Sequence, residues 1–235
     1  MLEGKVAIVT GASQGLGRAL ALAFTREGAS IVINSRSEER IRPVAREAES
    51  LDAEVLALAA DVSKSADVER LVGATVERFE RIDVLVNNAG VLGPRVPIEA
   101  YPEDEWRRVI DANLTGLFLV TKAAIPHMPE GGSIINVVSG VSVEGRAGWG
   151  AYSVSKFGVE GITQILASEL EGRRIRANAV DPGGMRTEMR AAAYPDEDPM
   201  TRITPEENTD VFLYLASERS RGVTGQRFKA QEFGR

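Results

Sequence analysis

Short apolar runs alternate with longer amphipathic segments, and this alternation constrains the fold more than any other feature. The runs are rich in Val, Ile and Ala and mostly lack strict polar alternation, which indicates strands buried on both faces. We expect strands at 5–10, 30–34, 54–60, 82–88, 133–139 and 175–181. We expect helices between them at about 15–28, 37–51, 65–80, 102–127 and 151–171. This order predicts an α/β fold with a parallel sheet covered on both sides, and right-handed crossovers make it doubly wound.

The chain contains no obvious linker, repeat or low-complexity tract, so we expect a single domain over residues 1–235. One irregular stretch, at about 182–205, is rich in Gly, Pro and charged residues and precedes a helix beginning near Pro205. Functional loops have this composition, and so do plain connections. We expect it to contain a short substrate loop at about 183–205.

Composition excludes several classes of function. The net charge of −6 disfavours general nucleic-acid binding, which requires a basic face. The chain has no cysteine, which excludes disulfides and thiolate zinc sites, and its one histidine, His127, cannot build a multi-histidine metal site. We interpret His127 as a helix-end or loop residue and expect no metal. The chain starts without a cationic leader, and no apolar stretch approaches the roughly 20 residues that span a bilayer, so we expect a cytoplasmic protein without membrane association.

A glycine-rich loop, "TGASQGLG", follows the first strand and opens a helix. Gly11 permits a tight turn, Gly15 a close approach of ligand to backbone, and Gly17 close packing of helix on strand. The helix N-terminus then offers unpaired N–H groups and a positive dipole end to a pyrophosphate. The spacing differs from G-x-G-x-x-G, and a merely tight turn is the alternative interpretation. In this position the loop favours dinucleotide binding.

The end of the second strand indicates which dinucleotide is bound. Ser35 and Arg36 stand where an acidic residue would bind the ribose 2′-hydroxyl of NAD(H) and an arginine would favour a 2′-phosphate. We infer NADP(H) over NAD(H), unless Arg36 is an ordinary surface charge. Asp61 and Val62 follow the third strand, where they can meet the adenine, although Asp61 can instead cap the next helix.

Tyr152 and Lys156 stand four residues apart in "AYSVSKFGV", so a helix would project both side chains from one face. Taken alone, this spacing is typical of a solvent-facing amphipathic helix. Its interpretation depends on the rest of the chain.

Six motifs together resemble the short-chain dehydrogenase/reductase family. They follow one another as "TGASQGLG", "NNAG" (87–90), Asn113, Ser139, "YSVSK" (152–156) and "DPGGMRT" (181–187). The resemblance extends from Gly4 to about Gly225. It implies a Rossmann-type fold with a seven-stranded parallel sheet, and an oxidoreductase that transfers hydride between a nicotinamide cofactor and a small carbonyl or alcohol.

The resemblance also assigns residues to roles. It implies Tyr152 as the acid/base, Lys156 and Asn113 as its partners, and Ser139 as the group that polarises the substrate. The residues that it places along the cofactor are Gly11, Ser13, Gln14, Gly15, Leu16, Gly17, Asn88, Ala89, Gly90, Pro182, Gly183, Met185 and Thr187, together with Tyr152 and Lys156.

The chemistry of carbonyl reduction suits these residues. Tyrosine can donate the required proton, but its free pKa is about 10, so work near neutral pH requires a depression of roughly 3 units. Lys156 supplies positive charge one turn away, and oxidised nicotinamide adds more. Ser139 can donate to the substrate oxygen, and Asn113 would hold a water that links Lys156 to solvent.

Several departures from the family pattern affect the prediction. Gln14 replaces an arginine found in many relatives, which leaves the NADP(H) assignment mainly on Arg36. The segment 188–205 is short for a lid, which predicts an open or shallow pocket. Trp149 is either a pocket wall or a core anchor. The tail lacks Asp-Gly-Gly, which puts one subunit contact in doubt, but helices 102–127 and 151–171 can still form a dimer face, and we expect a dimer or tetramer.

Two other functions remain as alternatives. A 3-oxoacyl-thioester reductase would need a cationic patch, for which Arg107, Arg108 and Arg190 are candidates. A sensor or scaffold that binds NADP(H) without catalysis could use the same fold, although the complete set of catalytic residues argues against it.

Overall fold

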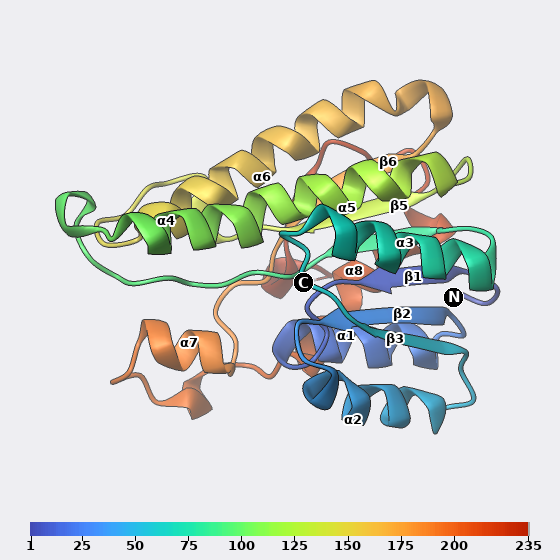
Figure 1. Cartoon of the computed structure of the whole chain (residues 1–235), viewed down its shortest axis with the longest axis horizontal. Helices are drawn as coiled ribbons and strands as arrows, with labels where there is room; N and C mark the ends of the chain where they lie inside the picture. Colours follow the sequence, from blue (N-terminus) through green and yellow to red (C-terminus); the bar gives the residue numbers. More distant parts are fainter. Residues whose placement is uncertain (235) are drawn as a thin grey trace.

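Parallel strands form one sheet at the centre of the computed structural model, which describes residues 1–234 (Figure 1). Within that range seven strands pair in the order β3-β2-β1-β4-β5-β6-β7. Their bounds are β1 Val6–Val9, β2 Ser30–Ser35, β3 Val55–Ala59, β4 Val84–Asn87, β5 Ser133–Val137, β6 Arg176–Asp181 and β7 Arg227–Lys229. The doubly wound, seven-stranded fold predicted from the sequence is confirmed, with strand ends shifted by a few residues. Because chain order reverses between β1 and β4, ligands bind at the carboxyl ends of these strands.

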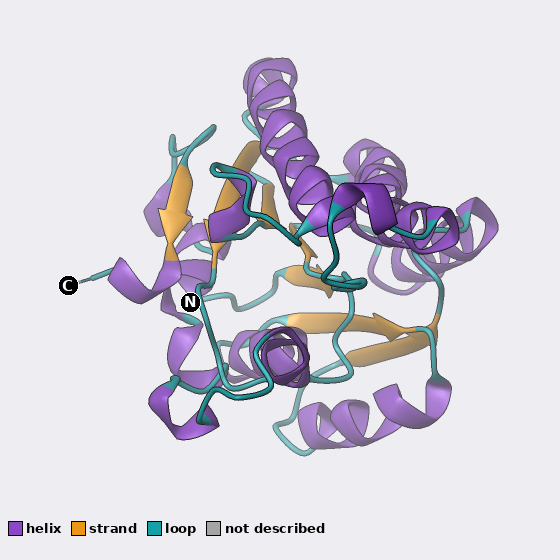
Figure 2. Ribbon diagram, turned by 90° about the vertical axis from the view of Figure 1, so that its left-hand side faces the viewer, coloured by secondary structure: helices purple, strands orange, loops and turns teal. Residues whose placement is uncertain are grey.

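Helices cover both faces of the sheet and enclose two apolar cores (Figures 1 and 2). One core packs α1 (Gly15–Arg26), α2 (Glu38–Glu49) and α8 (Asp210–Ala216) against the sheet. The other packs α3 (Ser65–Phe79), α5 (Gly116–Ala124) and α6 (Gly150–Glu169) against the opposite face. The strands are therefore buried on both sides, which explains their continuous apolar runs.

The helix predicted at 102–127 has the expected extent but an interrupted structure. It consists of α4 (Glu103–Ile110), a π-helical turn (Asp111–Thr115), α5 and a final 3₁₀ turn (Ile125–His127). His127 thus lies at a helix end, as expected. The sequence pattern did not predict the π turn, although such turns often occur at functional sites. Asn113 lies within it.

The same stretch, Glu103–His127, corrects the expectation that no segment is long and apolar enough to cross a bilayer. By length and composition it meets that criterion, because an 18-residue window within it has a mean hydropathy of 1.3. Core helices of globular proteins meet the criterion as well, so this is weak evidence for a membrane. Val109, Val120 and Ala124 are fully buried against the rest of the fold.

The irregular stretch at 182–205 is more ordered than its composition indicated. It contains α7 (Glu188–Ala193) and a 3₁₀ turn (Pro199–Thr201), and a bridge between Met185 and Ile203 closes it at its base. Figure 1 shows α7 standing apart from the sheet and its flanking helices. The segment therefore projects as a folded flap beside the carboxyl ends of the strands.

Candidate active site

A cleft of about 1060 Å³ lies where the carboxyl ends of the strands meet α7. It contains every residue predicted along the cofactor and every predicted catalytic residue except Asn113. The predicted residues that line it are Gly11, Ser13, Gln14, Gly15, Leu16, Gly17, Ser35, Arg36, Asp61, Val62, Asn88, Ala89, Gly90, Ser139, Tyr152, Lys156, Pro182, Gly183, Met185 and Thr187. Segments far apart in the sequence thus meet around one continuous space.

The glycine loop has the shape of a phosphate cradle. Gly11 and Gly15 adopt positive φ angles of 66° and 54°, which side chains strongly disfavour. A Cβ atom on Gly17 would lie 2.4 Å from the Gly11 carbonyl oxygen, so only glycine fits there. Gln14 precedes α1 without a side-chain capping hydrogen bond, which leaves N–H groups of the first turn for an anion. These features fit the pyrophosphate of a dinucleotide.

Three polar residues hold this loop in place, and of these the sequence analysis assigned only Asn88 to the site. The Gly11 N–H donates to Oδ1 of Asn34, 3.2 Å away, and Nδ2 of Asn34 donates to the Ala60 carbonyl. Nδ2 of Asn88 donates to the Thr10 carbonyl at 2.8 Å, and the Thr10 hydroxyl accepts from the Ala89 N–H. A buried asparagine inside the apolar run "SIVIN" was the available signal for Asn34.

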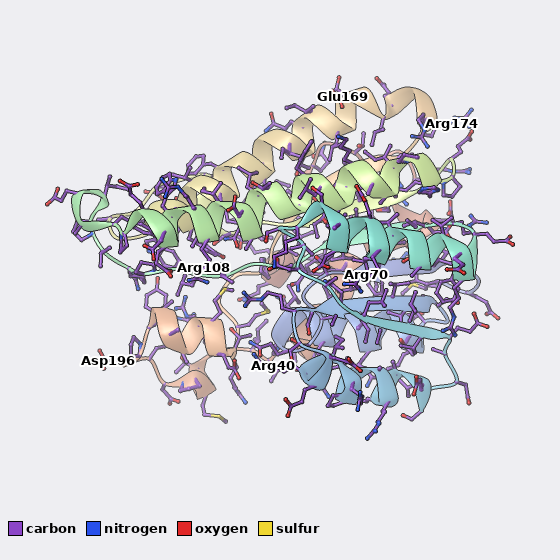
Figure 3. All side chains as sticks on the ribbon, viewed as in Figure 1. Arg40, Arg70, Arg108, Glu169, Arg174 and Asp196 are labelled. Carbon is purple, nitrogen blue, oxygen red and sulfur yellow. The ribbon has the colours of Figure 1, made fainter. Side chains whose placement is uncertain are left out.

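Cationic side chains lie at the adenosine end of the cleft. Arg36 is exposed at the end of β2 and makes no hydrogen bond or ion pair with the residues described. Arg40, one turn into α2, also lines the cleft, and Figure 3 shows it on the side of α2 that faces α7. The site can therefore offer two arginines to a 2′-phosphate, of which sequence analysis found only Arg36.

The Asp61 side chain serves the turn before α3. Its Oδ1 accepts from the Ser63 N–H and the Ser63 hydroxyl, at 3.1 and 2.7 Å. Asp61 therefore lines the cleft beside Val62 and stabilises the turn. The alternative that it caps the next helix is wrong, because Lys64 holds the N-cap position of α3 and no side chain makes a capping hydrogen bond there.

Three segments bridge the mouth of the cleft near Arg40. Nε2 of Gln14 donates to Oε2 of Glu188 at 2.9 Å, and Arg40 donates to the other end of the Gln14 amide. Arg40 also lies 3.6 Å from the Glu188 carboxylate. The glycine loop, α2 and α7 are thus joined by one exposed polar cluster, named here the Gln14–Arg40–Glu188 bridge.

Tyr152 and Lys156 lie together on the buried face of α6, 9% and 4% exposed. The simple interpretation as a solvent-facing helix is therefore wrong. The Lys156 ammonium donates to the Val137 carbonyl at 2.6 Å, which ties α6 to the end of β5. Ser139 lies just beyond β5, after Val138, and lines the same space. The neighbouring hydroxyls of Ser153 and Ser155 donate to backbone carbonyls, as expected of packing residues.

Burial governs the titration of this pair. It raises the pKa of Tyr152 to about 12, against a smaller lowering by the Ser139 hydroxyl and a further rise from the Asp181 carboxylate. It lowers the pKa of Lys156 to about 8, partly offset by Asp181 and Glu160. The predicted depression of the Tyr152 pKa is therefore wrong for the protein groups by themselves, because burial raises this pKa and the only lowering effect comes from the Ser139 hydroxyl.

Asn113 holds a neighbouring segment rather than lining the cleft. Its Oδ1 accepts from the Val91 N–H at 2.7 Å, and its Nδ2 donates to the Val91 carbonyl and to Ser155. The side chain therefore joins Val91 to Ser155 of α6. The water link between Asn113 and Lys156 stays a prediction.

The far end of the cleft is aromatic and partly covered. Trp149 is buried and its ring lies 5.6 Å from that of Tyr152 and 6.1 Å from that of Tyr194, so it is both a wall and a core anchor. Arg95 lies between the Trp149 and Tyr194 rings, 4.7 and 5.0 Å from their centroids, and donates to the Ala193 carbonyl. The flap thus contacts the opposite wall, and the expectation of an open or shallow pocket does not hold at this end.

Comparison with known proteins agrees with this geometry. The family model for short chain dehydrogenases matches residues 5–198. A 3-oxoacyl-acyl-carrier-protein reductase, FabG, from Thermotoga maritima is 41% identical, over 96% of this chain and 95% of its own length.

Solved structures are similar over nearly the whole fold. A short chain dehydrogenase from Pseudomonas syringae is 40% identical with a TM-score of 0.95, covering 98% of this chain and 96% of its own. One from Shigella flexneri, solved in complex with NADP, is 36% identical with a TM-score of 0.92, covering 98% of both chains. The chain therefore belongs to the short chain dehydrogenase family of oxidoreductases.

Proposed function

We propose that residues 1–235 act as one NADP(H)-dependent oxidoreductase domain that interconverts a carbonyl and a secondary alcohol. One observation carries this proposal: Ser139, Tyr152 and Lys156 lie at one end of a cleft whose other end is lined by Arg36. A bound dinucleotide in that cleft would supply the hydride and, when oxidised, a positive charge. Residues 183–205 would form the substrate loop.

The chain's own groups would bind and orient both reactants. The first turn of α1 and the glycine loop would bind the pyrophosphate, while Arg36 and Arg40 would bind the 2′-phosphate. The NADP complex of the Shigella flexneri relative supports NADP(H) over NAD(H). Met185 and Thr187, at the base of the flap, would hold the nicotinamide end.

Proton transfer would fall to Tyr152. The Ser139 hydroxyl would donate to the substrate oxygen, and the Tyr152 hydroxyl would transfer its proton to the same oxygen as negative charge develops there. Lys156 would keep the resulting phenolate stable, because its ammonium lies one helical turn away on the same buried face. Trp149 and the flap would exclude water from this end.

The proposal is tested by following NADPH oxidation with a panel of ketones and 3-oxoacyl thioesters. Tyr152→Phe removes the proton donor and is expected to lower kcat by a factor on the order of 10² or more, the range of general acid catalysis. Tyr214→Phe, in the aromatic cluster beside Phe228 and Phe233, is the matched control and should retain activity. Unchanged turnover by Tyr152→Phe would refute the assigned role.

The FabG relative favours a 3-oxoacyl thioester as one candidate substrate. The three arginines expected to form a cationic patch already make ion pairs, so they are not available to an acidic carrier. Arg107 pairs with Glu103 at 3.0 Å, Arg108 with Glu105 at 2.6 Å, and Arg190 with Glu197 at 2.5 Å. We therefore keep the broader assignment of a carbonyl reductase. Tight NADPH binding without turnover of any member of the panel would instead favour a sensor or scaffold.

A further inference from the structure

Arg227 connects the last strand of the sheet to the proposed catalytic residues. It stands in β7, directly opposite Ala179 of β6, and no sequence motif singled it out. Its guanidinium donates through Nε to Oε1 of Glu160 and through Nη2 to Oδ2 of Asp181, each at 2.9 Å. Nη2 also lies 3.3 Å from the Ser139 carbonyl oxygen. One side chain of β7 thus joins β6, α6 and Ser139, which lies just beyond β5.

These contacts fix the backbone that carries the Ser139 hydroxyl. The Ser142 hydroxyl lies 2.6 Å from the Ser139 carbonyl and 2.7 Å from Oε1 of Glu160, but its single proton can serve only one acceptor at a time. The guanidinium has five N–H donors in a rigid fork and can serve all its acceptors together. Arg227 can therefore hydrogen-bond the Ser139 carbonyl continuously, whereas the Ser142 hydroxyl cannot do so while it donates to Glu160.

The same group balances charge behind the cleft. Asp181 ends β6 and its Oδ1 accepts from the Gly183 N–H at 2.9 Å, which shapes the turn into the flap. Its negative charge raises the pKa of Tyr152 and of Lys156, and Glu160 adds to the effect on Lys156. Side chains of Asp181, Glu160 and Arg227 are only 11%, 14% and 23% exposed, so solvent screens these charges weakly.

We propose that Arg227 is a positioning residue for the carbonyl chemistry: it holds the Ser139 backbone in place and offsets the Asp181 charge beside Tyr152 and Lys156. This inference rests on the function proposed above. Besides Lys156 and Asp181, the charged residues that line the cleft outside residues 11–62 are Arg108, Asp111, Arg146, Arg186, Glu188, Arg190 and Glu206. Arg108 and Arg190 are already paired with Glu105 and Glu197, and Glu188 with Arg40. Asp181 would thus stabilise the turn into the flap, while the Arg227 charge would reduce the repulsion between the Asp181 carboxylate and a phenolate forming on Tyr152.

The charge effect is measured by the titration of Lys156, which requires no substrate. Lysine ε-carbons are labelled with ¹³C, and the Lys156 resonance is assigned by its loss in Lys156→Met. Arg227→Gln is expected to raise the midpoint, and Asp181→Asn to lower it, each by on the order of one pH unit. The double variant should return close to the parent value. Lys229→Gln, two residues along β7 and paired with the exposed Glu232, is the matched control for charge.

Kinetic measurements separate the support of the Ser139 backbone from the compensation of the Asp181 charge. For a ketone that the parent protein reduces, the pH profile of kcat/KM in Arg227→Gln should shift to higher pH together with the Lys156 midpoint. Arg227→Lys keeps the charge but loses the fork, so kcat should fall about tenfold without a shift of the profile and without a change in KM for NADPH. This conservative variant also keeps the test open if Arg227→Gln does not fold.

The possible results separate the role of Arg227 from the proposed function. The inference would be overturned if the parent protein reduces a carbonyl substrate but Arg227→Gln leaves both the Lys156 midpoint and the pH profile unchanged. A shifted Lys156 midpoint in a protein that turns over no carbonyl would refute the proposed function and leave the charge relationship standing. Equal losses of activity in all variants, without opposite shifts of the Lys156 midpoint in Arg227→Gln and Asp181→Asn, would mean that Arg227 is merely structural. That result would also overturn the inference.

Discussion

Lys156 combines a functional position with a cost in stability. Burial lowers its pKa from 10.5 to about 8, so at neutral pH the fold holds a charge that water would solvate better. In the unfolded chain the lysine keeps its proton up to about pH 10.5. Between pH 8 and 10.5 the unfolded state therefore binds more protons than the folded state, and this residue makes stability rise with pH.

Lys156→Met should consequently stabilise the protein while abolishing the proposed catalysis. The free energy of unfolding at pH 7 is expected to increase by on the order of 1–3 kcal/mol, because the desolvated charge is removed. The increase should shrink by pH 9.5, where the parent lysine is mostly neutral. Urea unfolding at both values measures it, with Lys122→Met, an exposed lysine on α5, as control. A loss of stability at pH 7 would contradict the assignment.

Individual residues were predictable where a motif marks them and not where a fold contact defines them. Ser139, Tyr152 and Lys156 were found because their spacing resembles a family pattern. Asn34 and Arg227 were not, since their importance comes from partners 23 to 88 residues away in the sequence. The direction of the Tyr152 pKa was also missed, because burial cannot be judged from its neighbours in the chain.

At the scale of elements, α7 and α2 meet at the Gln14–Arg40–Glu188 bridge. The Glu188 carboxylate competes there with any 2′-phosphate for Arg40. Exposed ion pairs are individually weak, so their rearrangement on cofactor binding costs little. The contacts of this bridge join the flap to the margin of the adenosine end of the cleft.

Opposite changes in cofactor affinity should follow from Glu188→Gln and Arg36→Asp. Glu188→Gln frees Arg40 and is expected to tighten NADPH binding a few-fold, about 0.5–1 kcal/mol, without affecting NADH. Arg36→Asp should weaken NADPH binding by about 10- to 100-fold and reverse the preference. Fluorescence titration with both cofactors tests this, with Glu38→Gln as the control in α2. Equal affinities of the parent protein for NADPH and NADH would contradict the proposed role of Arg36 in binding the 2′-phosphate.

Elements were predictable where hydrophobic periodicity is strong. Strands β1 to β6 and the long helices lie close to their expected ranges because their apolar patterns are continuous. Strand β7 was expected only from the family resemblance, and no range was predicted for it. The π turn at Asp111–Thr115 was not predictable, since inserting one residue into a helix leaves the apolar pattern on either side intact. The order within 182–205 arises from non-local contacts such as the Met185–Ile203 bridge, which composition does not reveal.

At the scale of the whole molecule, α5 and α6 expose an apolar face. Its residues are Phe118, Val154, Phe157 and Ile165, each between 44% and 55% exposed. Large apolar side chains gathered on two neighbouring helices are typical of a subunit interface. We propose that two copies of the chain pair through these helices.

Phe118→Glu combined with Phe157→Glu should therefore convert a dimer into a monomer of 25.3 kDa. Each copy would bury two carboxylates without partners, which costs several kcal/mol per ion and opposes association. Light scattering after gel filtration measures the mass, and Ile98→Glu, which changes an exposed isoleucine just before α4, is the control. A parent protein that elutes as a monomer would contradict the proposal.

The two ends of the cleft are built by different stretches of the chain. Residues 11–62 form most of the adenosine end, while residues 139–194 form most of the reaction end, and the glycine loop touches the flap only at its margin. Mutations that alter the aromatic wall can therefore accumulate without disturbing the choice of dinucleotide. Such a layout lets descendants of one ancestor acquire new substrates while each still draws on the same cellular pool of reducing power.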